Sequence, residues 1–137
     1  MRSFEEIEAR IDALAEAGDA SAAAELMELG EEVLKHWLEG RDEAPTGDKR
    51  EGFRLLALHR QGCKGEPSFN ACRETCRELT YHYNLITMDP GHEDIGRRVR
   101  LAAMVAKHLC LFVSGKMQEA KLGEFCCSSR DLRANGA

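Results

Sequence analysis

Hydrophobic residues recur every three or four positions along most of the chain, which is the spacing of one face of an α-helix. A first helix is expected to follow Ser3, with Glu6 completing a capping box, and to end at Gly18. A second is expected to begin near residue 19 or 21 and to run to residue 38, before a loop over residues 40–47. No stretch alternates apolar and polar residues as a half-buried strand does. The pattern therefore predicts an all-α protein.

Prolines at positions 45, 67 and 90 divide the remaining chain, because proline does not continue a helix interior. We expect Asp48 to cap a third helix, a fourth to follow Pro67, and a fifth to start with Asp89 as its cap and Pro90 as its first residue. The fifth is apolar on nearly all sides, which is typical of the helix at the centre of a bundle.

These elements together predict a compact antiparallel bundle of four to five helices. The bundle should occupy residues 1–125 as a single domain. Residues 126–137 lose the apolar periodicity, so they are expected to form a short flexible C-terminal tail that carries two cysteines.

Composition narrows the location and the partners. The 137 residues are 43% hydrophobic and 31% charged, and no apolar run approaches the roughly 20 residues that a membrane-spanning helix needs. The first residues lack the apolar stretch of a secretory signal, so we expect a cytoplasmic protein that does not associate with membranes. Basic residues are scattered, which disfavours nucleic-acid binding.

The charge is unevenly distributed along the chain. Residues 1–43 hold 4 basic and 13 acidic side chains, while the whole chain has a net charge of −5. The acidic segment of residues 1–43 could pack on the basic remainder, or it could offer an acidic surface to another protein. We expect the acidic N-terminal helices to be the partner-facing surface. A homodimer is also possible, because the regular apolar seam from Phe69 to Ile86 could pack within the chain or against a second copy.

Six cysteines are the feature most suggestive of chemistry. Cys72 and Cys76 are four apart on one predicted helix, and His59 and Cys63 have the same spacing on the helix before it. Folding the two helices back on each other would bring one imidazole and three thiols together. Thiolate and imidazole are good ligands for tetrahedral zinc. The sequence thus predicts a structural zinc site at this helical hairpin.

Several alternatives stay open at this stage. Cys126 or Cys127 could replace His59 as the fourth ligand, and four thiolates could instead hold an iron–sulfur cluster. The cysteines could also cycle between thiol and disulfide, or pack as ordinary core residues with no cofactor at all. No motif of an established enzyme class occurs. We therefore expect a small accessory or interaction protein, non-enzymatic, with a redox protein as the alternative.

Overall fold

A computed structural model describes residues 1–122, and five α-helices account for most of them. They are α1 (Phe4–Ala17), α2 (Ala22–Gly40), α3 (Arg54–Cys63), α4 (Arg73–Met88) and α5 (Ile95–Glu119), with the 3₁₀-helix η1 (Pro67–Cys72) between α3 and α4. No β-strand forms between residues 1 and 122. The predicted all-α bundle is confirmed. The expected tail over residues 126–137 lies outside the described residues.

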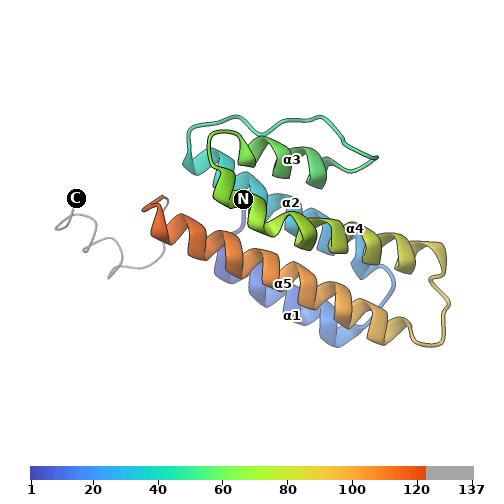
Figure 1. The fold of residues 1–137 in the computed structure, drawn as a ribbon. Helices are drawn as coiled ribbons and strands as arrows, with labels where there is room; N and C mark the ends of the chain where they lie inside the picture. The colour runs from blue at the N-terminus through green and yellow to red at the C-terminus, as the bar shows by residue number, and fades with distance from the viewer. Residues whose placement is uncertain (123–137) are drawn as a thin grey trace.

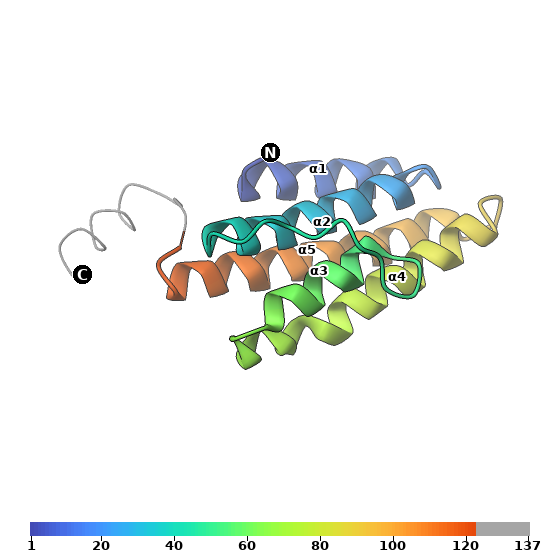
Figure 2. The same ribbon diagram turned by 90° about the horizontal axis from the view of Figure 1, so that it is seen from above.

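The fifth helix is central. It packs against α1, α2 and α4. Figures 1 and 2 show α1 and α2 as one antiparallel pair, α4 and α5 as a second, and α3 lying over the outer side of α2 and α4. One strip of α5 nevertheless faces solvent, where Leu101, Met104 and Leu111 are 37%, 67% and 53% exposed. The central position is as predicted, although the helix is not enclosed on every side.

The ends of the first helix form as its sequence predicts. The Ser3 hydroxyl accepts a hydrogen bond from the Glu6 backbone N–H at 3.1 Å, and the Ser3 N–H donates to the Glu6 carboxylate at 3.0 Å. Gly18 ends the helix in the left-handed conformation, with φ at +67°. Glycine is favoured there because a Cβ makes this conformation costly.

The predicted starts of the third and fifth helices are both wrong. Helix α3 begins at Arg54 instead of following Asp48, because Arg50 and Phe53 close a tight turn through two backbone hydrogen bonds of 3.0 and 2.9 Å. Glu51 has φ of +53° in that turn, which no α-helix can incorporate. Helix α5 begins at Ile95. Asp89 instead follows the last residue of α4 and accepts a backbone hydrogen bond in a turn before α5.

Candidate functional site

The C-terminal end of α3 is held against α2 and η1 by a close approach at Gly62. The Trp37 indole N–H donates to the Gly62 carbonyl oxygen at 3.1 Å, and the Phe69 ring stacks on Trp37 with centroids 4.4 Å apart. A Cβ on Gly62 would lie 2.9 Å from the Phe69 ring and 3.0 Å from the Trp37 ring. Only glycine lets the three elements meet this closely, and their meeting fixes the positions of His59 and Cys63.

Four side chains predicted as metal ligands gather at this junction of α3, η1 and α4. The Cys63 sulfur lies 3.5 Å from His59 Nε2. On the other side, His59 and Cys76 both act on the Cys72 thiol and lower its pKa. We call His59, Cys63, Cys72 and Cys76 the thiol cluster. The hairpin therefore forms, and it places the side chains of the two helices beside each other.

The thiols of the cluster differ in exposure and in acidity. Cys72 and Cys76 are fully buried, whereas Cys63 is only half-buried. The hydrogen bond from Cys76, with help from His59, lowers the pKa of Cys72 to about 6. Cys72 also immediately precedes α4, where the helix dipole favours a thiolate. The same hydrogen bond, together with burial, raises the pKa of Cys76, and burial raises the pKa of Cys63.

The proximity of these side chains does not amount to a formed metal site. Within residues 1–122, no group of three or more His, Cys, Asp or Glu side chains is arranged so that it could hold a metal ion. In its protonated form, the Cys72 thiol donates a hydrogen bond to the Phe69 carbonyl oxygen at 3.3 Å. The alternative ligands Cys126 and Cys127 lie outside the described residues. Binding of zinc and binding of an iron–sulfur cluster both stay predictions.

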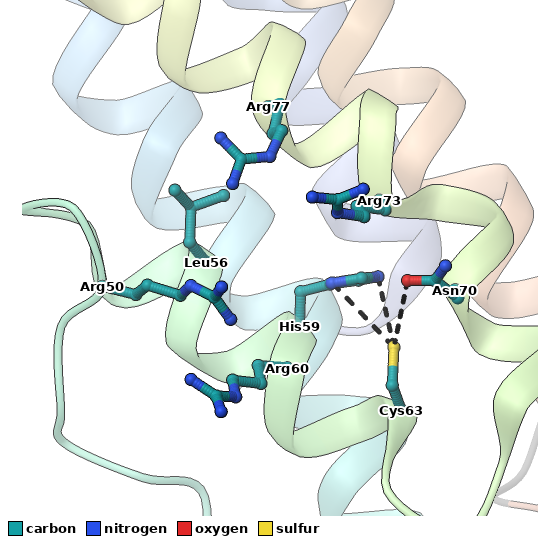
Figure 3. Close-up of a pocket in the computed structure, with 8 residues that line it drawn as sticks. All are labelled: Arg50, Leu56, His59, Arg60, Cys63, Asn70, Arg73 and Arg77. Atoms are coloured by element: carbon teal, nitrogen blue, oxygen red, sulfur yellow. Dashed lines mark hydrogen bonds between the residues drawn. The ribbon is translucent and has the colours of Figure 1, made fainter.

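A small pocket opens beside the thiol cluster, and it is lined by arginines. Its volume is about 110 Å³. Figure 3 shows Arg50 and Arg60 on the side of the preceding loop and α3, and Arg73 and Arg77 on α4, with His59 between them. We call this the arginine pocket. Its lining residues are Arg50, Leu56, His59, Arg60, Cys63, Asn70, Arg73 and Arg77.

The positive charge of the arginine pocket is only partly compensated. Arg77 donates to the Glu51 carboxylate at 2.7 and 3.3 Å, which lowers the pKa of Glu51. Arg50 lies 4.0 Å from the same carboxylate. Across residues 1–122, no carboxylate forms an ion pair with Arg60 or Arg73. Glu51 is thus the one carboxylate within ion-pairing distance of these four guanidinium groups among residues 1–122, so positive charge is in local excess in a protein that is acidic overall.

Sequence reasoning missed this pocket because its arginines are far apart along the chain. Residues 49–77 hold seven basic and three acidic side chains, which is a local excess inside an acidic protein. Arg73 and Arg77 are also four residues apart, so they share one face of α4. Those two signals could have pointed to the site. The fold supplies what the sequence does not, by bringing the turn before α3 against the start of α4.

The acidic N-terminal helices make several ion pairs with other elements. Glu32 pairs with Arg2 at 2.7 Å, and Asp12 pairs with Lys107 of α5 at 3.0 Å. Other acidic side chains of α1 and α2, including Glu16 and Glu28, are exposed. Residues 1–43 therefore keep an acidic surface, and its role as a partner-facing surface stays a prediction.

Neither the described helices nor comparison with other proteins indicates a further role. None of the helices within residues 1–122 has both the length and the hydropathy needed to cross a bilayer. Compared with protein families, with curated proteins and with solved structures, the chain matches none.

Proposed function

We propose that this protein is a small accessory protein that binds an oxyanion in the arginine pocket. The observation that carries the proposal is the convergence of four guanidinium groups from two sides on one cavity, where Glu51 is the one described carboxylate within ion-pairing distance. Guanidinium groups donate paired N–H bonds in a plane that matches phosphate and carboxylate oxygens. The His59 ring and the Asn70 side chain supply further polar groups in the same wall.

The size of the arginine pocket supports a small ligand group. A cavity of about 110 Å³ is several times larger than the space that one water needs, so it has room for a small polar group. A single tetrahedral oxyanion has comparable bulk. The half-buried Cys63 thiol lies in the pocket wall, and its raised pKa keeps it neutral, so it does not repel an anion.

Calorimetric titration with inorganic phosphate at low salt tests the proposal. Replacing Arg73 with alanine should weaken binding about tenfold, because a hydrogen bond to a charged group contributes about 1.5–3 kcal/mol. Arg100→Ala is the matched control, since Arg100 is an exposed arginine of α5 that does not line the pocket. Absence of phosphate binding, or an equal loss in both variants, would refute a specific site.

A second candidate function is soft-metal binding by the thiol cluster. The observation that favours it is the contact of His59 with both Cys63 and Cys72, together with the lowered pKa of Cys72. Metal binding would require the side chains to rotate from the arrangement described above. Anaerobic purification followed by metal analysis tests this. Stoichiometric zinc supports the structural site, iron with a visible absorption band supports an iron–sulfur cluster, and thiol loss on mild oxidation without metal supports thiol–disulfide cycling.

The free cysteines and the acidic surface bear on where the protein works and what it meets. A reducing location such as the cytoplasm suits a chain whose described cysteines are all free. The exposed acidic side chains of α1 and α2 are the surface proposed to meet a protein partner. Neutralising Glu16 and Glu28 should leave phosphate binding intact and should abolish partner capture, because these side chains lie outside the arginine pocket.

A further inference from the structure

A second, larger cavity adjoins the arginine pocket and shares two of its arginines. It has a volume of about 460 Å³, against about 110 Å³ for the arginine pocket. Arg50 and Arg60 line both cavities, so they form the boundary between them. We call the second cavity the loop pocket. Its lining residues are Thr46, Asp48, Lys49, Arg50, Ala57, Arg60, Gln61 and Lys64.

The loop that forms one wall of the loop pocket is tied to α3. The Gln61 side chain accepts from the Thr46 backbone N–H and donates to the Ala44 carbonyl oxygen, each at 2.9 Å. Arg54 Nε donates to the Thr46 carbonyl oxygen at 2.9 Å. These three bonds hold residues 44–46 in place, so the cavity has two fixed walls and needs little rearrangement to accept a ligand.

The chemistry of the loop pocket is polar and contains no aromatic ring. Its cations Lys49 and Lys64 make no ion pair with any residue between 1 and 122. The Thr46 hydroxyl and the Asp48 carboxylate add a donor and an acceptor of the kind that sugar hydroxyls pair with. A purine or pyrimidine would find no ring to stack on, whereas a polyhydroxyl group would find charged and polar partners throughout.

We propose that the two cavities together bind a sugar phosphate, with its phosphate in the arginine pocket and its polyhydroxyl body in the loop pocket. This inference rests on the proposed function, because it places the oxyanion in the same arginine pocket. A phosphate monoester offers several charged oxygens and so makes use of more guanidinium groups than one carboxylate can. The shared residues Arg50 and Arg60 lie where the two parts of such a ligand join.

The experiment compares four probes on the full chain by calorimetry: inorganic phosphate, ribose 5-phosphate, ribose and adenosine monophosphate. Ribose 5-phosphate should bind at least about tenfold more tightly than inorganic phosphate, as expected for a few added hydrogen bonds. Ribose alone should not bind measurably, because most of the affinity comes from the phosphate. Adenosine monophosphate should bind no more tightly than ribose 5-phosphate.

A filling substitution separates the two cavities. Ala57 lines only the loop pocket, so Ala57→Leu should occupy that space and reduce the affinity for ribose 5-phosphate to that for inorganic phosphate. Binding of inorganic phosphate should be unchanged. Ala13→Leu, at an exposed position of α1, is the matched control and should change neither affinity. Leucine is a good helix former, so both variants should fold.

The outcomes distinguish the two proposals. If inorganic phosphate binds but ribose 5-phosphate binds no more tightly, the sugar-phosphate inference is wrong and the oxyanion site stands. If no phosphate-bearing probe binds, both fail. Tighter binding of adenosine monophosphate than of ribose 5-phosphate would overturn the assignment to a polyhydroxyl ligand. An unchanged preference for ribose 5-phosphate in Ala57→Leu would remove the loop pocket from the site.

Discussion

The α1–α2 pair and the α3–α4 hairpin differ in how far their charged side chains are paired with charges of the opposite sign. In the first region acids meet basic partners, as in the ion pairs of Glu32 with Arg2, of Glu25 with Arg10 and of Asp12 with Lys107. In the second, four arginines line one pocket, and only Arg77 and Arg50 lie within ion-pairing distance of a carboxylate, that of Glu51. Balanced pairs at a surface contribute little beyond solubility. An unbalanced, concave cluster of one sign attracts ions of the opposite sign, which is the physical basis of the proposed oxyanion site.

The largest effect should come from breaking the packing beneath the hairpin. Phe69→Ala removes a fully buried ring that stacks on Trp37 and lies beside His59. The free energy of unfolding should therefore fall by about 3–5 kcal/mol. Urea denaturation measures this loss. Because Phe69 also positions the pocket wall, phosphate binding should weaken in the protein that still folds. Met104→Ala, at an exposed position of α5, should change stability by less than about 0.5 kcal/mol.

The next effect concerns pH and the thiol cluster. The pKa of Cys72 is lowered to about 6 in the folded protein, so its ionisation stabilises the fold. This contribution is complete at pH values above the ordinary pKa of a thiol. That contribution should be lost as the pH falls through about 6. Cys72→Ala should remove this part of the pH dependence in thermal unfolding curves.

Cys110 provides the matched comparison for that experiment. Burial raises its pKa to about 12, so it stays protonated throughout the same pH range. At pH values below the ordinary pKa of a thiol, Cys110→Ala should therefore lower the free energy of unfolding without changing its slope with pH. An equal change of slope in both cysteine variants would show that Cys72 is not the titrating group.

A smaller effect should follow from removing the one acid that balances the arginines. Glu51→Gln removes the carboxylate that Arg77 contacts, so inorganic phosphate should bind a few-fold more tightly, because one competing negative charge at the surface is gone. Glu32→Gln, which removes an acid from the N-terminal region, should leave phosphate affinity unchanged. A fall in affinity in Glu51→Gln would mean that Glu51 positions Arg77 for the ligand.

The smallest effect should come from breaking an ion pair in the balanced region. Arg10→Ala removes the contact with Glu25 that joins α1 to α2. The side chains of Arg10 and Glu25 both reach solvent. The midpoint of thermal unfolding should change only slightly, because exposed ion pairs contribute little to stability. A loss as large as that of Phe69→Ala would show that charge pairing, and not apolar packing, holds the N-terminal helices together.

The helices could be predicted from the sequence because their causes are local. The Ser3 capping box, the Gly18 terminus and the apolar spacing each act within a few residues. The starts at Asp48 and Asp89 were wrong because capping residues also occur in turns, and the Arg50–Phe53 turn competes with a helix there. The gathering of the cysteines followed from one short connection between two helices. The arginine pocket needed the position of a loop relative to α4, which depends on Gly62, Trp37 and Phe69 packing together.

The contact between Arg77 and Glu51 joins α4 to a turn 26 residues earlier in the chain. Arg77 also lines the arginine pocket, so one side chain serves as a tether for the turn and as a donor for the ligand. A guanidinium has five N–H groups in a fixed plane, and those facing Glu51 are not free to face an anion as well. A bound anion and a firmly held turn are thus competing states of the same residue. Binding of the ligand should therefore release the turn around Glu51, and its backbone amides should exchange hydrogen faster.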